Sequence, residues 1–429
     1  MGRIYDVNAH LHTPYSFSAF RSVTQALDMA AEEGVKVVGI NDFYSMDGYG
    51  EWKEECGRRR LFPLFNIEFI SLNAEDQAAG LRVNDPNNPG RTYISGKGLA
   101  FPVKLSGEPA AQLAAVKKES NLQVAAMCEK VAKLFADAGV EFGWDEASIR
   151  EKLTKGSLRE RHLAKAIRLA VEGRWPVGAG HDVSGGVGHD VSSGSGHDVS
   201  SGAGHDVSGG SDHDGKGNVI PDLIGDLYAK ILGQPLKSDI TNNAAVENEI
   251  RSRLLKAGGA AFVPETPEAF LPMATVREII LAAGGIPTYP FLADDAKGGF
   301  TDFEGDLAKA AATLKARGFY STEFITTRNS VEVLERYAQY LWDQGFVVTF
   351  GSEHNTPAME PIKLACRGGV DLTDNLKRLN YWGACIVAAH QKLVADGFQG
   401  YLDAQGRPDL KYRDKFILMG DKIIKEAIK

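Results

Sequence analysis

Gly34-Val35-Lys36-Val37-Val38-Gly39-Ile40 is the stretch that decides the fold, because a glycine that ends a helix is followed at once by a nearly continuous apolar run. Such a run is typical of a parallel strand that is covered on both faces. The residues before it predict a strand at Ile4 to Val7 and a helix at Thr24 to Glu33. Those after it predict a helix at Glu51 to Arg59 and a strand at Phe62 to Ser71. This βαβαβ order predicts parallel strands.

The last third of the chain repeats this alternation of strands and helices. The predicted elements are the strand Gly285 to Tyr289, the helix Phe303 to Arg317, the strand Phe319 to Ile325, the helix Ser330 to Gln344 and the strand Phe346 to Phe350. Between the two alternating regions the pattern is almost wholly helical. We therefore expect an α/β fold, a distorted (β/α)7-type barrel with an inserted helical subdomain over the strand ends, where barrel enzymes place their sites.

Four parts of the chain follow from these patterns. We expect the first half of the barrel at 1–109, the helical insertion at 110–263, the second half at 264–360 and a C-terminal helical extension at 361–429. Within the insertion, Gly180-His181-Asp182 recurs every eight residues, in a segment at 174–218 that is rich in Gly and Ser. Little apolar surface offsets the entropy of ordering there, so a flexible low-complexity loop is expected, with a metal-trapping loop as the alternative.

Composition limits the partners of the protein. The formal net charge of -8 and a pI near 5.8 argue against an extended basic surface for duplex nucleic acid, whereas a small anionic substrate needs only a local basic pocket. The 4 cysteines are far apart and form no Cys-x-x-Cys, which indicates reduced thiols and a cytoplasmic protein. No signal peptide and no membrane span are expected, and no heptad pattern indicates an oligomeric state.

Histidines and carboxylates follow two of the predicted strands. His10 and His12 come directly after the first strand, and alternate residues of an extended chain share a face, so both imidazoles are expected to converge. Phe350-Gly351-Ser352-Glu353-His354-Asn355 offers a carboxylate and a third imidazole at a late strand end. Because distant strand ends meet at the mouth of a barrel, these side chains predict a metal site.

The order of these segments resembles that of the PHP (polymerase and histidinol phosphatase) superfamily. Asn41-Asp42-Phe43 looks like the family's Thr-Asp-His, Asn66-Ile67-Glu68 looks like its Gly-Ile-Glu, and Gly284 to Pro290 resembles the segment that ends in Ala-His-Pro. In the insertion, Arg161-His162-Leu163-Ala164 and Phe262-Val263-Pro264 resemble the helical insert of the nucleotide-phosphatase branch. Outside the repeat, the resemblance extends to about residue 357.

Several positions depart from the family pattern. Phe43 and Tyr289 stand where the family has histidines, and Glu353 and Asn355 stand where its final motif has an aspartate and a histidine. The resemblance then implies one divalent metal, Zn²⁺, Mn²⁺ or Fe²⁺, with a second as the alternative. The implied ligands are His10, His12 and Glu68 with Glu353 or His354, and Asp42 is implied as a catalytic residue or an extra ligand.

The activity implied by the resemblance is hydrolysis of a small phosphomonoester or nucleotide-like phosphate, with metal-bound hydroxide as nucleophile. Arg161 and His162, on a basic helix predicted at Leu158 to Ala170, are expected to bind the phosphate from the insertion, the alternative being a solvated charged face. Two rival functions remain. One is a degenerate protein that binds a phosphorylated or carbohydrate-like ligand without hydrolysis, and the other is a lyase or isomerase that uses one metal as a Lewis acid.

Overall fold

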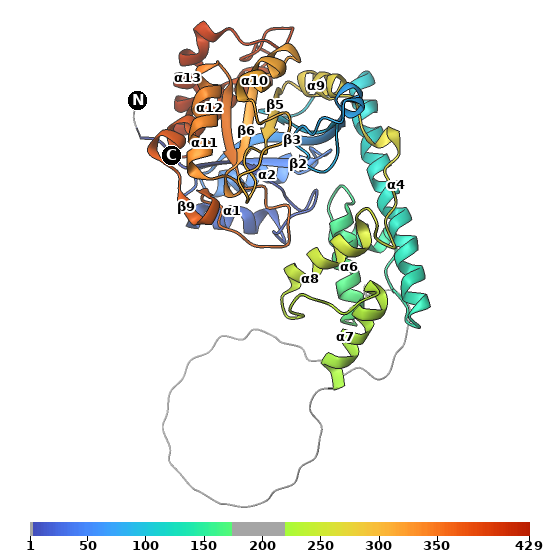
Figure 1. The fold of residues 1–429 in the computed structure, drawn as a ribbon. Coiled ribbons are helices and arrows are strands. Elements are labelled where there is room, and N and C mark those ends of the chain that lie inside the picture. The colour runs from blue at the N-terminus through green and yellow to red at the C-terminus, as the bar shows by residue number, and fades with distance from the viewer. Residues whose placement is uncertain (1–2, 174–218) are drawn as a thin grey trace, which may run out of the picture.

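The structure of the protein is a computed structural model that describes residues 3–173 and 219–429. The Gly-His-Asp repeat, predicted to be a flexible loop, lies outside the described residues. Figure 1 shows two bodies, a barrel-like body formed by the first and last parts of the described chain and a helical insertion beside it.

The barrel is built on a seven-stranded sheet whose strands follow one another in sequence order from β1 to β7. The strands are β1 Val7–Leu11, β2 Val37–Phe43, β3 Phe62–Leu72, β4 Arg91–Lys97, β5 Ile286–Phe291, β6 Ser321–Ile325 and β7 Val347–Gly351. β1, β2 and β3 are parallel, as are β5, β6 and β7, whereas β4 runs antiparallel to both of its neighbours. The α/β barrel prediction is confirmed at this coarse level. β4 is a strand that the sequence patterns did not predict.

β7 returns beside β1 and nearly closes the barrel. The backbone N–H of His12 donates to the carbonyl of Glu353 at 2.8 Å, and the N–H of Glu353 donates to the carbonyl of His10 at 3.0 Å. A Cβ atom at Gly351 would lie 2.2 Å from the Cβ of His10, so a glycine is needed where the two strands meet. β1 also begins three residues later than the predicted strand at Ile4 to Val7, so that His10 lies within the strand.

Helices cover the barrel and form the insertion. Around the barrel lie α1 Val23–Glu32, α2 Tyr49–Arg58, α3 Ala74–Ala78, α9 Met273–Ala282, α10 Leu307–Ala316, α11 Val331–Asp343, α12 Asp374–Ala395 and α13 Arg413–Ala427. The insertion contains α4 Gly107–Asp137, α5 Glu146–Leu153, α6 Glu160–Val171, α7 Val219–Leu232, α8 Asn243–Ile250 and the π-helical turn Arg251–Leu255. Among the described residues, none of these helices is both long enough and apolar enough to cross a bilayer.

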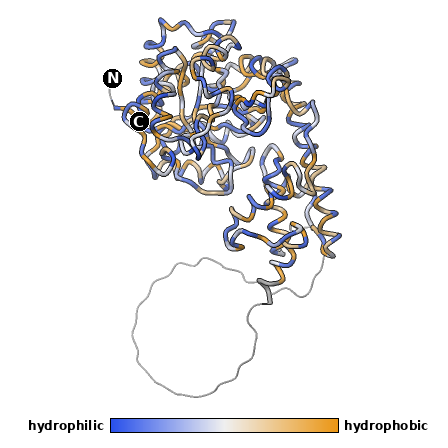
Figure 2. The backbone as a smooth tube through the Cα atoms, in the orientation of Figure 1, coloured by the Kyte–Doolittle hydropathy of each residue, from blue (hydrophilic) through white to orange (hydrophobic). Residues whose placement is uncertain are grey.

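The insertion has a hydrophobic core of its own. Phe135, Phe142, Leu163 and Ile167 are buried in it, in a cluster separate from the barrel core. The apolar segments of both bodies are visible in Figure 2. The long helix α4 runs from the barrel into the insertion (Figure 1), and it packs against α9 of the barrel and α6 of the insertion. The insertion is therefore a second packed unit that is held against the mouth of the barrel.

The C-terminal part of the chain packs directly on the barrel. From α12, the Asn380 side chain accepts a hydrogen bond from the N–H of Phe350 and donates one to the carbonyl of Val7. Gln391, three turns further on, accepts from the N–H of Phe65. These buried amides satisfy backbone groups of three strands, β1, β7 and β3, where the helix crosses them.

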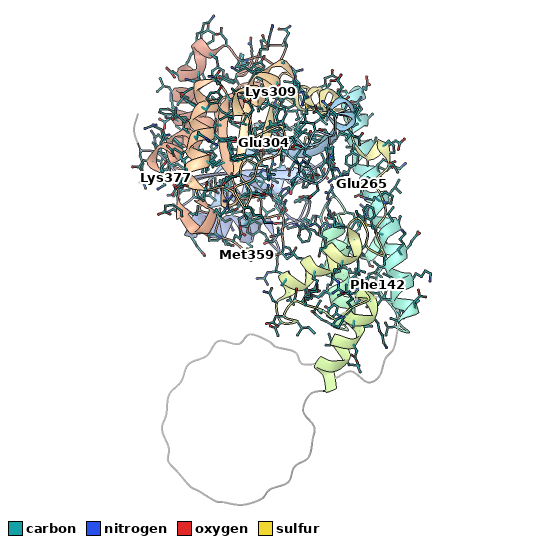
Figure 3. All side chains as sticks on the ribbon, in the orientation of Figure 1. Phe142, Glu265, Glu304, Lys309, Met359 and Lys377 are labelled. Atoms are coloured by element: carbon teal, nitrogen blue, oxygen red, sulfur yellow. The ribbon has the colours of Figure 1, made fainter. Side chains whose placement is uncertain are left out.

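Glu304 is a fully buried carboxyl that anchors the segment after β5 (Figure 3). It accepts hydrogen bonds from Tyr289 Oη at 2.8 Å and from the N–H groups of Leu292 and Ala293 at 3.1 and 2.7 Å. Burial nevertheless raises its pKa to about 8.

We predict that Glu304 makes the folded protein less stable as the pH rises. The folded state holds a proton on Glu304 up to about pH 8, while the unfolded chain releases it near the ordinary value of 4.5. The stability that Glu304 contributes is therefore full below pH 4.5. It falls as the pH rises to 8, by as much as roughly 1.4 kcal/mol per pH unit. In Glu304→Gln this slope should be absent, as urea denaturation at pH 5 and 8 would reveal. The exposed Glu278→Gln is the control, and an unchanged slope in Glu304→Gln would contradict the prediction.

Candidate metal centre

His10, His12 and Glu68 meet in a buried cluster inside the barrel mouth. His10 Nε2 lies 3.3 Å from His12 Nε2 and 3.5 Å from Glu68 Oε2, and His12 Nε2 lies 3.0 Å from Glu68 Oε2. The two histidines are alternate residues of β1 and both are fully buried, while Glu68 comes from β3. Ligand atoms about 2.0–2.1 Å from a tetrahedral Zn²⁺ lie about 3.3 Å apart, so the spacing suits one small divalent ion.

Glu323, on β6, determines which nitrogen of His10 carries the proton. Its Oε2 lies 3.0 Å from His10 Nδ1, and an ionised carboxylate only accepts, so Nδ1 is the donor. Burial lowers the pKa of His10, but Glu323 and Glu68 together outweigh that effect and raise it to about 9. At neutral pH the metal-free His10 is therefore protonated on both nitrogens, and a metal that binds at Nε2 must displace the Nε2 proton, after which the Nε2 lone pair faces His12 and Glu68.

Asp42 orients His12 through a serine. The Asp42 carboxylate accepts hydrogen bonds from Thr13 N–H at 2.7 Å, Thr13 Oγ1 at 2.5 Å and Ser16 Oγ at 2.6 Å. Because the Ser16 hydroxyl donates to Asp42, its oxygen is left to accept from His12 Nδ1, which lies 3.1 Å away. His12 Nε2 is thereby also left with its lone pair toward the cluster. Asp42 was expected to be catalytic or a ligand, and the structure places its carboxylate behind His12.

The amide of Asn41 does not use the lone pair of His10. Its Nδ2 lies 3.2 Å from His10 Nδ1 and 2.9 Å from His10 Nε2. The two lone-pair directions of an imidazole diverge, so an atom at nearly equal distances from both nitrogens is aligned with neither. His10 Nε2 remains available to a ligand.

One of the three facing atoms, the Glu68 carboxylate oxygen, lacks a hydrogen-bond partner. Glu68 Oε2 is buried and makes no hydrogen bond with the required geometry, although His12 Nε2 is 3.0 Å away. The two imidazoles lower the pKa of Glu68 despite its burial, so its carboxylate is ionised. Once His10 Nε2 loses its proton, the three facing atoms are electron-pair donors within 3.5 Å of one another, and a cation between them would satisfy all three. The residues therefore fit a divalent metal ion.

We predict that Asp42→Ala weakens metal binding by roughly 10- to 100-fold, since a group that orients a ligand typically contributes that much. The Asp42 carboxylate is the acceptor for the Ser16 hydroxyl, so without it Ser16 is no longer held to accept from His12 Nδ1. Titration with Zn²⁺ or Mn²⁺ against a competing chelator measures the change. Asp47→Ala is the matched control, because Asp47 bonds to Ser45 and Lys117 outside the cluster. Equal affinity in both variants would contradict this role.

Glu353 and His354 do not reach the cluster. Both residues have a left-handed backbone, with φ of 64° and 58°. Their side chains therefore do not alternate between the two faces as they would in an extended strand. The Glu353 carboxylate lies 2.5 Å from the Arg328 guanidinium. His354 Nδ1 lies 2.8 Å from Ser352 Oγ, and its Nε2 donates to the carbonyl of Glu360 at 2.8 Å. Glu353 contributes its backbone, not its carboxylate, to the strand that holds the histidines.

Lys97 and Glu323 are buried residues of the centre that the sequence patterns missed. Lys97, on β4, is 1% exposed, and its Nζ lies 2.6 Å from Glu323 Oε2. Burial raises the pKa of Glu323, but Lys97 and His10 outweigh it and lower the pKa overall. A charged residue in the middle of the predicted strand Phe319 to Ile325 was a signal for Glu323, because carboxylates are rarely buried without a partner.

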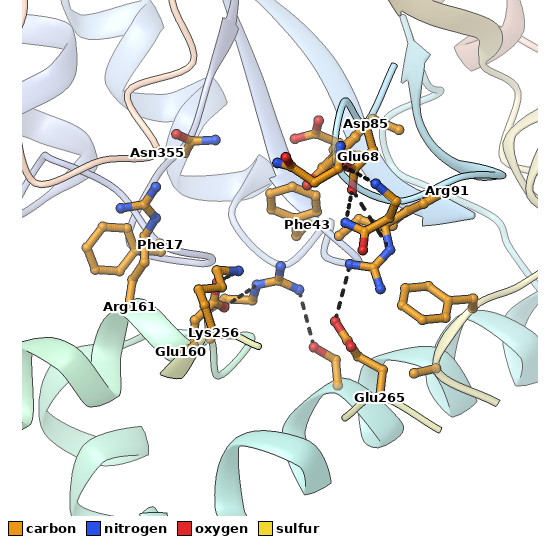
Figure 4. Close-up of a pocket in the computed structure, with 18 of the residues that line it drawn as sticks. Phe17, Phe43, Glu68, Asp85, Arg91, Glu160, Arg161, Lys256, Glu265 and Asn355 are labelled. Atoms are coloured by element: carbon orange, nitrogen blue, oxygen red, sulfur yellow. Dashed lines mark hydrogen bonds and ion pairs between the residues drawn. The ribbon is translucent and has the colours of Figure 1, made fainter. Parts of the chain in front are cut away.

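A cavity of about 660 Å³ opens above the cluster, between the barrel and the insertion (Figure 4). Glu68 is the member of the cluster that lines it. Its cationic lining residues are Arg91, Arg159, Arg161, Arg251, Lys256 and Arg328, and its carboxylates are Glu68, Asp85, Glu160, Glu265 and Glu353. Several of these charges are paired, as Lys256 and Arg251 are with Glu160. The mixed lining suits a small ligand with an anionic group.

Two neighbouring residues at the start of α6, His162 and Arg161, lie in different places. His162 is 2% exposed, its Nδ1 accepts the N–H of Arg159 at 3.0 Å, and burial lowers its pKa to about 3. It therefore helps to begin the helix and does not line the cavity. Arg161 lines the cavity beside Phe17, 5.6 Å from the ring centre (Figure 4), and donates to Asn248.

Arg159, which the sequence patterns did not single out, is connected to the cluster through the ring of Phe43. Its guanidinium is 4.6 Å from the centre of the Phe43 ring, and that ring stacks on His12 with centroids 5.1 Å apart. It donates to Ser120 Oγ at 3.3 Å and lies 3.9 Å from the Glu160 carboxylate, which leaves N–H donors over for a ligand.

Comparison with known proteins gives a fold likeness only. No family model matches the chain, and no curated protein matches its sequence. A Bifidobacterium adolescentis structure described as a "putative metal-dependent phosphoesterase" matches with a TM-score of 0.51 and 14% identity, over 88% of this chain and 96% of the other. An amidohydrolase from Chromobacterium violaceum, solved with sulfate and no metal, gives 0.47 and 11% over 87% and 96%. The first likeness shows the TIM-like barrel fold, and the second is too weak to add to it.

Proposed function

We propose that this chain is a metal-dependent phosphoesterase of the PHP type, which hydrolyses a small phosphomonoester or nucleotide-like phosphate at the His10–His12–Glu68 centre. The observation that carries the proposal is the set of three buried donor atoms, His10 Nε2, His12 Nε2 and Glu68 Oε2, that face one another within 3.5 Å. A cavity with several guanidinium groups lies directly above them.

Each residue of the centre has a role in this proposal. His10, His12 and Glu68 would hold one divalent metal, which when bound supplies a Lewis acid and lowers the pKa of a coordinated water. Glu323 and the Asp42–Ser16 pair keep protons on the Nδ1 atoms of the two histidines. Both imidazoles are thereby held in the tautomer that coordinates through Nε2.

Arg159 would bind the phosphoryl group of the substrate. Its guanidinium reaches from the insertion across Phe43 toward the centre, and a planar guanidinium matches two phosphate oxygens. The aromatic residues Phe43 and Tyr93, which line the same cavity, exclude water from the side of the centre where they pack. Substrate is thus expected to lie between the two bodies of the molecule.

Metal content and a phosphatase screen test the proposal. Protein purified without a histidine tag should contain one equivalent of metal that a His10→Ala/His12→Ala variant lacks. This subtraction is needed because the Gly-His-Asp repeat carries histidines of its own. With saturating Mn²⁺, a broad set of phosphomonoesters should release phosphate in the wild type and not in the double variant. Bound metal with no turnover of any substrate would contradict the proposed hydrolase activity. It would favour the alternative, a protein that binds a phosphorylated or carbohydrate-like ligand without hydrolysis.

A further inference from the structure

Lys97 occupies a cation site inside the barrel. Its Nζ lies 2.6 Å from Glu323 Oε2, 3.2 Å from the carbonyl of Ala9 and 3.3 Å from Asn41 Oδ1. These acceptors come from β6, β1 and β2, while the lysine itself comes from the antiparallel strand β4. Carboxylate, amide and backbone oxygens are also the ligands that a hard divalent cation takes. The ammonium therefore fills a place that would otherwise suit a metal ion.

This place is directly connected to the candidate metal centre. Glu323 Oε2, the oxygen that Lys97 contacts, is also 3.0 Å from His10 Nδ1. Asn41, whose oxygen accepts from Lys97, lies against the His10 ring through its amide nitrogen. Ala9 immediately precedes His10. Glu323 and the imidazole of His10 thus connect the ammonium of Lys97 to the cluster.

We propose that Lys97 is a built-in cation that takes the place of a second metal and keeps the centre mononuclear. The inference rests on the proposed metal centre and adds its nuclearity. A second divalent ion would compete with the ammonium for Glu323, and two cations at one carboxylate oxygen repel each other in a buried site. Lys97 is a positioning residue in this account, because it acts on the centre through Glu323 and His10.

Removing the ammonium should open the second site. In Lys97→Ala the oxygens of Glu323, Asn41 and Ala9 stay in place, and the buried Glu323 carboxylate loses its counter-ion. This variant should take up a second Mn²⁺, so that the metal bound in excess of the His10→Ala/His12→Ala variant rises from one equivalent to two. Lys97→Ala/Glu323→Gln should return to one equivalent, because a neutral amide offers no charge to bind the added ion.

The experiment is metal analysis of the full chain after equilibration with Mn²⁺ and removal of unbound ion, with circular dichroism as the check on folding. One equivalent in a folded Lys97→Ala protein would overturn the inference. So would two equivalents in the wild type, a result that leaves the proposed function standing. No bound metal in the wild type would remove the metal centre and the inference together.

Electron paramagnetic resonance of the wild type gives a test that needs no lysine variant. A single Mn²⁺ gives an isolated six-line spectrum, whereas two ions that share a carboxylate couple and change it. The isolated spectrum is expected at every Mn²⁺ concentration, after subtraction of the spectrum of His10→Ala/His12→Ala. A coupled spectrum would overturn the assignment of Lys97 even if Lys97→Ala fails to fold.

Discussion

His12→Asn should lose the bound metal and at least about 10³-fold of the phosphatase turnover. Metal ions contribute several kcal/mol to stabilising charge in such transition states, and about 4 kcal/mol corresponds to 10³-fold in rate. The Nε2 of His12 lies at the centre of the cluster, 3.3 Å from His10 Nε2 and 3.0 Å from Glu68 Oε2. Metal analysis and steady-state kinetics with the best substrate of the screen would measure both losses.

His354→Asn is the matched control for this prediction. His354 is also a buried histidine near the mouth, but its ring nitrogens contact Ser352 Oγ and the carbonyl of Glu360. The variant should keep its metal and most of its turnover. If it loses metal as completely as His12→Asn does, the third histidine belongs to the ligand set after all, and the turn at Glu353 and His354 must rearrange when metal binds.

Arg159→Met should lower kcat/KM by roughly 10- to 100-fold, because a charge-assisted hydrogen bond contributes about 1.5–3 kcal/mol. The methionine keeps the packing on Phe43 and removes the N–H donors that face the cavity. The loss should be smaller for a substrate whose phosphoryl group carries less negative charge, such as a phosphodiester, and the affinity for inorganic phosphate as an inhibitor should fall in parallel. Both are measured with the metal-loaded protein.

Arg161→Met separates this role from a general effect of positive charge. Arg161 lines the same cavity, but it lies over Phe17 and donates to Asn248, on the side away from Phe43. Its loss should change kcat/KM by no more than a few fold. A larger effect in Arg161→Met than in Arg159→Met would indicate that Arg161, the residue that the sequence pattern favoured, binds the phosphate.

The parts of the site that short-range patterns determine could be predicted from the sequence. His10 and His12 converge because they are alternate residues of one strand, a period that holds wherever the chain is extended. Glu68 joins them because β1, β2 and β3 are parallel and sequential, and Glu68 pairs in register with Phe43, the last residue of β2. Both contacts follow from the βαβαβ order of the first segment, which the apolar runs of the sequence predict.

The parts that depend on long-range pairing could not be predicted in this way. β4 interrupts the parallel order, and only its antiparallel register brings Lys97 opposite Ile286 and its ammonium to Glu323. No local sequence pattern indicates that β4 runs antiparallel to its neighbours. At Glu353 and His354 the alternation rule itself fails, because two consecutive left-handed residues replace the extended backbone that the rule assumes.

The separate core of the insertion has a consequence for heat denaturation. Two bodies with their own cores can unfold in separate steps, and only an assembled pair presents Arg159 to the metal centre. An anion held by both bodies would then act as a reversible cross-link. It would add a free energy of RT ln(1 + [L]/Kd) to the assembled state, so the two melting transitions should draw together into one as ligand is added.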